Sequence, residues 1–326
     1  MNDVKTAPSV RFIDLKPPED ALLPLVLSGL AGTPKALPAK LFYDRTGSEL
    51  FERICEQPEY YPTRTEMGIL RRIAGEVSDL AGSDVQLVEF GAGALEKVGI
   101  LLNAMHRPAG FVALDISGEH LLQAAQACAA QFPDLEVIAI AADYSQPFTI
   151  PDPSTGAPAR RLGFFPGSTI GNMLPEEARA FLENAGALLG PGGLMLLGAD
   201  LVKDPAVLEA AYNDAAGVTA AFNRNMLVHL NQALGCDFDP TAFDHHAFFN
   251  AERARIEMHL VSRCDQTVLV DTHPISFGAG ESIHTENSHK YTLERVADLG
   301  RSAGFQTRAQ WTDPDHLFSV TLLQRG

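Results

Sequence analysis

Two glycines and two aspartates stand where apolar, strand-like runs of the sequence end. The run VQLVEF is followed by Gly91 and Gly93, FVALD ends in Asp115, and LEVIAIAAD ends in Asp143. Open α/β sheets bind ligands at the carboxyl ends of their strands, where glycine lets the backbone approach a ligand and an acid can bind ribose hydroxyls. These residues predict a nucleoside cofactor, and a tight strand-to-helix turn without a ligand is the alternative.

The residues after the glycines distinguish between nucleotides. A dinucleotide fingerprint needs a third glycine at position 96, where this chain has Glu96 followed by Lys97. An acidic residue there suits a pyrophosphate poorly. S-adenosylmethionine carries no phosphate, and Lys97 could pair with its carboxylate. The loop therefore favours methyl transfer over hydride transfer, and a nicotinamide dehydrogenase stays as an alternative.

The elements that must position these residues alternate between strand and helix from residue 85 to residue 202. This pattern predicts a parallel sheet with helices on both faces. We expect a Rossmann-like, doubly wound, mostly parallel α/β sheet of seven strands, formed by residues 66–202 and 290–326. Residues 1–65 and 203–289 are expected to form a second, α+β domain.

Composition and charge exclude several classes of partner. The chain has 25 Lys and Arg against 41 Asp and Glu, a formal charge of −16, so nucleic acid and membrane surfaces are poor partners. Residues 1–20 have no apolar core, and we expect no signal peptide. Four cysteines without a CxxC pair indicate reduced thiols and a cytoplasmic protein. The oligomeric state is not determined, and a monomer is compatible with the sequence.

Six longer sequence words are spread over nearly the whole chain. They are LFYDRTGSELFERICEQPEYYPTRTE, FPGSTIGN, LGADLVKD, NDAAGVTAAFNRN, RIEM and HTENSHKY. Together they resemble the L-histidine Nα-methyltransferases of ergothioneine biosynthesis. The resemblance implies a class I methyltransferase fold with an inserted substrate-binding domain, S-adenosylmethionine as donor, and three methylations of the α-amino group that give hercynine. Two alternatives stay open: another amino acid or small amine as acceptor, and a nucleoside-binding regulatory module without turnover.

The family's functional positions can be carried over to this sequence one by one. Its cofactor contacts correspond to Tyr43, Gly91, Lys97, Asp115, Asp143 and Tyr144. Its histidine contacts correspond to Tyr60, Gly167, Asn172, Tyr212, Met258, Glu286 and Ser288. The cofactor loop here contains Ala92 and Ala94 where the family often has Ser and Thr, so two hydroxyls are absent while backbone contacts remain expected.

Methyl transfer to an amine is a displacement at carbon, so the site must hold a neutral amine in line with the sulfur–carbon bond. No nucleophilic side chain is needed. We assign Asn172, Tyr60 and Tyr212 as the catalytic groups that position the substrate's amino and carboxylate groups. Without the resemblance, Asn172 would be interpreted as a turn or helix cap. Tyr61 is expected to matter less than Tyr60.

Glu286 and Ser288 stand two residues apart, so in an extended segment they project to one face. They could bind both ring N–H groups of an imidazole, or one N–H and one lone pair. The order of His284, Glu286 and His289 differs from the helical HExxH motif, and displacement at a sulfonium needs no Lewis acid. We therefore expect no metal.

Overall fold

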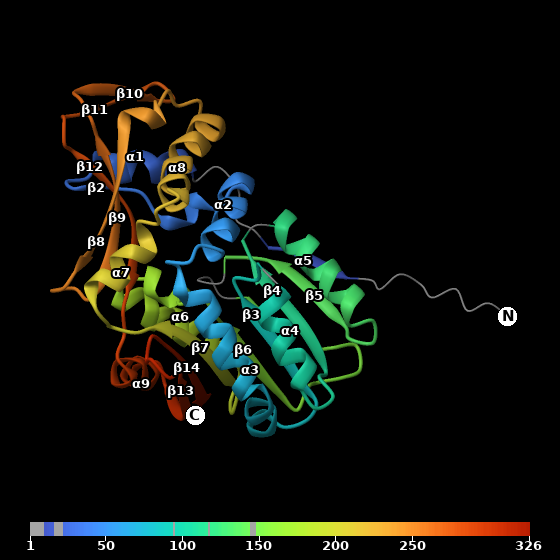
Figure 1. Cartoon of the computed structure of the whole chain (residues 1–326). Coiled ribbons are helices and arrows are strands. Elements are labelled where there is room, and N and C mark those ends of the chain that lie inside the picture. Colours follow the sequence, from blue (N-terminus) through green and yellow to red (C-terminus); the bar gives the residue numbers. More distant parts are fainter. Residues whose placement is uncertain (1–9, 16–21, 94, 117, 144–147) are drawn as a thin grey trace. The chain divides into compact units, whose positions relative to one another are not determined.

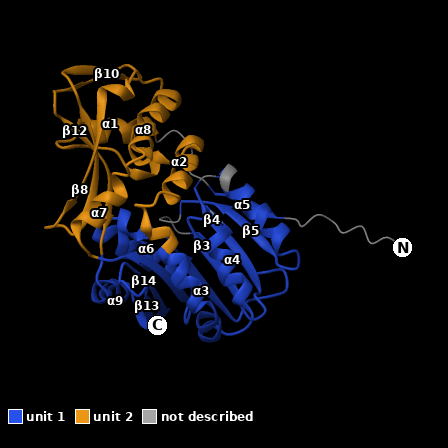
Figure 2. Ribbon diagram, in the orientation of Figure 1, with its two compact units in different colours: residues 1–17, 65–201, 291–326 blue, residues 18–64, 202–290 orange. Residues whose placement is uncertain are grey.

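The computed structural model describes residues 10–15, 22–93, 95–116, 118–143 and 148–326 (Figure 1). The chain divides into two compact units (Figure 2). Unit 1 contains Met1–Pro17, Thr65–Leu201 and Tyr291–Gly326, and unit 2 contains Pro18–Arg64 and Val202–Lys290. Among the described residues, no helix combines the length and the apolar character that a membrane span requires.

Unit 1 contains a large sheet and its helices, including α3, whose first turn belongs to unit 2. Its described elements are β1 (Arg11–Asp14), α3 (Tyr61–Ala81), β3 (Val85–Phe90), α4 (Leu95–Ala104), β4 (Gly110–Asp115), α5 (Gly118–Gln131), β5 (Val137–Ala141), β6 (Arg160–Phe165), η3 (Thr169–Asn172), α6 (Pro175–Leu189), β7 (Leu194–Asp200), α9 (Leu293–Ser302), β13 (Phe305–Thr312) and β14 (Phe318–Arg325).

The strand order of the large sheet is β1-β5-β4-β3-β6-β7-β14-β13. The strands from β1 to β7 are parallel, while β14 pairs antiparallel with both β7 and β13. The doubly wound, mostly parallel α/β fold is confirmed. The expected number of seven strands is wrong, because the described sheet has eight.

The additional strand is β1, which we expected in the second domain. Arg11 pairs with Ile138 and Asp14 with Ala141, so β1 extends the sheet beyond β5 in unit 1. The segment has only four residues, and its burial pattern shows no buried position. It therefore lacks the apolar signal that marks the other parallel strands, although pairing covers the edge of β5 that would otherwise be open.

Side chains alternate between the two faces of the sheet. Leu87 and Ala113 belong to the cluster that packs against α3, α4 and α5, whereas Val88 and Leu114 pack with α6 and α9. Every residue of β3 is buried as a result. This burial on both faces explains why apolar residues dominate the parallel strands in the sequence.

Unit 2 combines helices with a four-stranded sheet and a separate β-hairpin. Its elements are α1 (Leu22–Ala31), β2 (Lys35–Ala36), η2 (Ala39–Phe42), α2 (Arg45–Cys55), α7 (Pro205–Tyr212), α8 (Val218–Leu234), η4 (Pro240–Ala242), β8 (Phe243–Asn250), β9 (Arg255–Ser262), β10 (Gln266–Val270), β11 (His273–Phe277) and β12 (Ser282–His289). The sheet order is β2-β12-β9-β8, and β10 pairs with β11.

Helix α8 packs against β8, β9 and α2, and its N-terminus is set by local hydrogen bonds. The Asp214 carboxylate accepts the N–H groups of Val218 and Thr219 at 2.8 and 2.7 Å. Gly217 precedes the helix with a φ of 71°, which favours glycine. The word NDAAGVTAAFNRN thus encodes the start of α8.

Candidate active site

The glycine loop after β3 is anchored at its first glycine. Gly91 has a φ of 74°, and the N–H groups of Gly91 and Ala92 both donate to the Leu114 carbonyl, at 2.8 and 2.9 Å. A left-handed backbone of this kind favours glycine. A Cβ placed on Gly93 would meet no described atom within 4 Å. The loop therefore leaves space at its second glycine for the close approach of a ligand.

Four ionisable groups gather at this end of the sheet in unit 1. Burial raises the pKa of Glu89 to about 8; Lys97 opposes the rise, while Glu66 and Asp115 add to it. Lys97 and Asp115, both predicted cofactor contacts, thus lie close enough to Glu89 to act on its charge. Because Glu89 keeps its proton near neutral pH, this end of the sheet is less negative than its acids suggest.

Glu66 of α3 connects three parts of unit 1, and the sequence analysis did not identify it. The side chain is fully buried and accepts the Gly167 N–H with both oxygens, at 3.0 and 2.9 Å. Lys97 Nζ lies 2.6 Å from Glu66 Oε2. A Cβ at Gly198 of β7 would overlap Glu66 Oε1, so glycine there makes room for the carboxylate. Glu66 is the last residue of the sequence word that ends in PTRTE, and this position was the signal in the sequence that could have identified it.

The turn after β6 carries Gly167 and Asn172, both predicted to bind substrate. Gly167 has a φ of 77° and Ser168 a φ of 59°; the Ser168 hydroxyl accepts the Asp200 N–H at 2.9 Å. Asn172 ends η3 and is partly exposed, while Leu174 is the N-cap of α6. Asn172 is therefore not that helix's cap, and its amide faces no partner among the described residues.

Two further predicted cofactor contacts follow β5. Asp143 lies two residues after the last residue of the strand and is partly exposed. Tyr144 lies outside the described residues. The remaining predicted contact, Tyr43, belongs to unit 2, where its ring centroid lies 6.0 Å from those of both Phe51 and Phe222.

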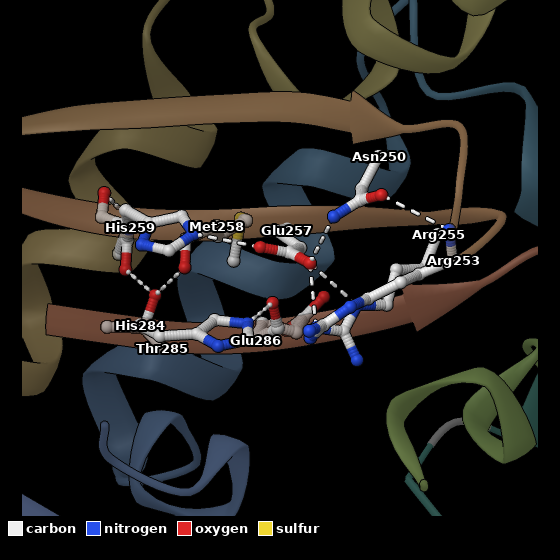
Figure 3. A network of polar contacts seen from close by, with 10 residues as sticks. Asn250, Arg253, Arg255, Glu257, Met258, His259, His284, Thr285 and Glu286 are labelled. Atoms are coloured by element: carbon white, nitrogen blue, oxygen red, sulfur yellow. Dashed lines mark hydrogen bonds and ion pairs between the residues drawn. The ribbon is translucent and has the colours of Figure 1, made fainter. Parts of the chain in front are cut away.

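In unit 2, a β-bulge aligns the predicted imidazole contacts on β12. The register shifts between His284 and Glu286, after which Glu286 pairs with Met258 and Ser288 with Ile256 on β9. Figure 3 shows Thr285 at this point, its hydroxyl directed at the Met258 carbonyl. Glu286 and Ser288 therefore project to the face that carries the buried Met258.

A closed triangle of polar atoms joins α7 to the end of β12. The Tyr212 hydroxyl donates to Ser288 Oγ at 2.7 Å. Lys290 Nζ donates to Ser288 Oγ at 2.8 Å and to the Tyr212 hydroxyl at 3.1 Å. The sequence analysis missed Lys290, although it stands two residues after Ser288 and so on the same face of an extended segment.

Glu286 and Tyr60 are neighbours of this triangle. Burial raises the pKa of Glu286 to about 7, and Lys290 limits the rise. No hydrogen bond from the described residues reaches the Glu286 carboxylate. Burial also holds the pKa of Tyr60 well above its usual value, with contributions from Tyr212, Cys55, Glu286 and Tyr43. The Tyr60 ring meets the Tyr212 ring edge to face at 6.3 Å. The predicted substrate contacts of unit 2 thus form one cluster.

Tyr61, the expected control, has a different partner. Its hydroxyl accepts a hydrogen bond from Lys203 Nζ at 2.6 Å, and the same ammonium lies 4.5 Å from the ring centroid. His245 donates from Nε2 to the Tyr212 carbonyl at 2.9 Å and accepts from Asn223 on its other nitrogen. Burial lowers the pKa of His245, which fits a neutral ring that orients α7.

His284 lies with Glu257 and His259, as Figure 3 shows, and these are residue types that ligate metals. One ligand atom from each lies within 4.8 Å of the others. The two rings are stacked at 4.7 Å with 14° between their planes, and Glu257 Oε1 lies 2.7 Å from an Arg255 nitrogen. Lone pairs in two nearly parallel ring planes do not converge on one point. The two histidine rings thus form a stacked pair beside the ion pair of Glu257 and Arg255.

Comparison with known proteins gives consistent results. The model of a family described as histidine-specific, S-adenosylmethionine-dependent methyltransferases matches residues 22–325. The chain is 43% identical to the histidine N-alpha-methyltransferase of Mycolicibacterium smegmatis, covering 94% of this chain and 95% of that protein. It is 42% identical to the enzyme of the same name from Mycobacterium tuberculosis, covering 91% and 92%.

A third relative is larger. The ergothioneine biosynthesis protein 1 of Neurospora crassa is 29% identical over 86% of this chain, which covers 32% of the fungal protein. The family match includes both units, with the glycine loop of β3 and the polar cluster of β12 inside it. The chain therefore belongs to the histidine-specific, S-adenosylmethionine-dependent methyltransferases.

Proposed function

We propose that this protein transfers three methyl groups in succession from S-adenosylmethionine to the α-amino nitrogen of L-histidine, forming hercynine. Unit 1 binds the methyl donor, and unit 2 recognises the imidazole. The family match supports this reaction, and the mycobacterial relatives with more than 40% identity carry the corresponding name.

The observation that carries the proposal is the state of the Glu286 carboxylate. It lies beside Lys290 and Tyr60, its pKa is raised to about 7 by burial, and no described residue hydrogen-bonds it. A ring N–H of histidine would supply the missing donor. A substrate without such a donor would leave a largely desolvated carboxylate unpaired, which costs several kcal/mol and provides discrimination.

The residues of unit 1 fit a nucleoside sulfonium donor. The loop leaves open space at Gly93, and the carboxylate of Asp115 stands at the strand end where ribose hydroxyls are bound. We assign Gly91, Lys97 and Asp143, with Tyr43 and Tyr144, to the same ligand. Lys97 is already paired with Glu66, and its remaining N–H groups are those proposed for the donor's carboxylate.

When bound, S-adenosylmethionine supplies an electrophilic methyl group. The chain's own residues orient the amine: Asn172 and Gly167 are assigned to its amino and carboxylate groups, together with Tyr60 and Tyr212. Orientation of this kind can contribute several kcal/mol, up to about 7–11 kcal/mol in ideal intramolecular models. We propose that the reaction needs no metal, because displacement at a sulfonium requires no Lewis acid.

None of the four cysteines forms a disulfide in the structure, which supports our proposal that the protein acts in the cytoplasm. We keep the expectation of no nucleic-acid or membrane partner on the basis of the net charge of −16. We keep the expectation that a monomer is compatible with the proposed reaction.

Glu286→Ala tests the proposal. We expect this variant to lose most of its methylation of L-histidine. Mass spectrometry measures the methylation as successive additions of one methyl group to histidine. Glu281→Ala is the matched control, because Glu281 lies just before the same strand and pairs with Lys35. Calorimetric titration with decarboxylated and ring-altered analogues then separates the carboxylate contacts from the ring contacts. Unchanged activity of Glu286→Ala on histidine would contradict the imidazole assignment.

A further inference from the structure

We propose that Lys290 is a positioning residue that makes the Ser288 hydroxyl a hydrogen-bond donor, so that the site selects a neutral imidazole with its N–H on Glu286 and its lone pair on Ser288. The inference rests on the proposed methylation of histidine and extends it to the protonation state of the ring that is recognised.

The direction of the hydrogen bonds follows from what each group can donate. An ammonium has three N–H donors and no acceptor, so Ser288 Oγ and the Tyr212 hydroxyl must both accept from Lys290. Ser288 Oγ also accepts the Tyr212 O–H at 2.7 Å. A hydroxyl oxygen has two lone pairs, and both are occupied here. Ser288 therefore has only its own proton to offer a ligand.

The same count applies to the Tyr212 hydroxyl. Its proton is directed at Ser288, and it accepts one N–H from Lys290. The Tyr212 O–H is thus engaged with Ser288 and is not offered to the substrate.

The position of Lys290 agrees with a role in recognition. The side chain is 2% exposed, its backbone N–H donates to the Ala254 carbonyl at 2.8 Å, and Nζ lies 4.8 Å from the centroid of the Tyr212 ring. Burying an ammonium is expensive unless it is well paired. Lys290 lies close enough to Glu286 of β12 to lower its pKa, and its ammonium contacts the hydroxyl and the ring of Tyr212 on α7. A surface role cannot account for a charge held in this environment.

A neutral imidazole complements the two groups on β12. It has one N–H for the Glu286 carboxylate and one lone pair for the Ser288 O–H. An imidazolium carries two N–H groups, and one of them would face the Ser288 proton. A pyrrole ring lacks the lone pair and a pyridine ring lacks the N–H, so neither can satisfy both residues.

The experiment compares Lys290→Met, Ser288→Ala and the double variant in kcat and KM for histidine. Lys203→Met is the matched control, since Lys203 also donates to a tyrosine hydroxyl and lies over its ring, at Tyr61. We expect Lys290→Met to raise KM roughly tenfold, as for the loss of a hydrogen bond to a charged group. Lys290→Arg should recover part of the loss, and the control should stay within about twofold of the wild type.

The double-mutant cycle tests whether Lys290 acts through Ser288. We expect the KM of the double variant to lie within about twofold of the KM of Ser288→Ala, because Lys290 and Ser288 contribute to the same contact with the ring. Binding of S-adenosylmethionine, measured by calorimetry, should be unchanged in each variant and shows that the variants fold.

A second readout uses pyrrolylalanine as a substrate that has the ring N–H without the lone pair. The wild type should strongly prefer histidine over this analogue. The preference should fall in Lys290→Met, because Ser288 regains a free lone pair. If Lys290→Met does not fold, Tyr212→Phe provides the same test by removing the O–H that Ser288 accepts.

Three results would overturn the inference: a KM of Lys290→Met within twofold of the wild type, fully additive effects in the cycle, or equal methylation of pyrrolylalanine and histidine by the wild type. Each of these requires a wild type that methylates histidine. A wild type inactive on histidine would instead overturn the proposed function.

Discussion

Replacing Glu286 with Gln should move activity and stability in opposite directions. The substitution keeps the size of the side chain and removes a carboxylate whose pKa is raised to about 7 by burial. We expect weaker recognition of histidine, because a charge-assisted hydrogen bond to the ring N–H becomes a neutral one. The loss in kcat/KM should be roughly tenfold. The unliganded protein should become more stable at alkaline pH.

The size of the expected change in stability follows from the pKa of Glu286. A rise from 4.5 to about 7 corresponds to about 3 kcal/mol, at about 1.4 kcal/mol for each pH unit. Glu286 keeps some exposure, so solvent screening reduces this to about 1–2 kcal/mol. Folding raises the pKa of this acid, and the folded state therefore binds the proton more tightly. The resulting cost is absent below pH 4.5, grows between pH 4.5 and 7, and is complete above pH 7.

Urea unfolding of the wild type and the Glu286→Gln variant at pH 5 and pH 8 measures this effect. We expect a higher unfolding midpoint for the variant at pH 8 and little difference at pH 5. Glu281→Gln is the control with the opposite sign, because Lys35 holds the pKa of the Glu281 carboxyl below its usual value. A Glu286→Gln variant that is less stable than the wild type at pH 8, or equally stabilised at both pH values, would refute the reasoning.

Further predictions concern the donor end, the two tyrosines and metals. Glu66→Gln should lower the affinity for S-adenosylmethionine in calorimetry and destabilise the protein by about 3–5 kcal/mol in urea, because Lys97 loses its buried partner. Gly198→Ala should act in the same direction, since its Cβ displaces the Glu66 carboxylate, and wild-type affinity in both variants would contradict this role. Tyr60→Phe should reduce kcat/KM for histidine by about tenfold and Tyr61→Phe by less than about twofold, and the reverse order would contradict the assignment. Prior treatment with EDTA should leave the initial rate unchanged, whereas a loss that Zn²⁺ restores would show a metal requirement.

The parallel strands of unit 1 were predictable because their physics is visible in a single segment. A strand covered on both faces is mostly apolar, as in β3 and β7, and the glycine after β3 marks a left-handed backbone. Strand β1 was not predictable in this way. Its four residues gain their conformation from pairing with β5, and nothing in the segment itself indicates that partner.

Part of the candidate site was also recognisable. Glu286 and Ser288 could be assigned to one face because they stand two apart in an extended segment. The bulge at Thr285 was not visible, because it depends on the pairing of β12 with β9. Glu66 was missed for a related reason: a glutamate on an amphipathic helix is normally interpreted as a solvated residue, and its burial depends on Lys97, Gly167 and the absence of a side chain at Gly198.

The amino-acid sequence by itself determined the class of fold, the family and the residue types available for recognising histidine. These properties are local, since periodicity, glycine positions and long sequence words need no knowledge of distant contacts. Only the tertiary structure decided which way the hydrogen bonds run, because Tyr212 and Lys290 meet Ser288 from different elements and together occupy both of its lone pairs. A hydroxyl can donate or accept until its neighbours are known, and folding brings those neighbours together.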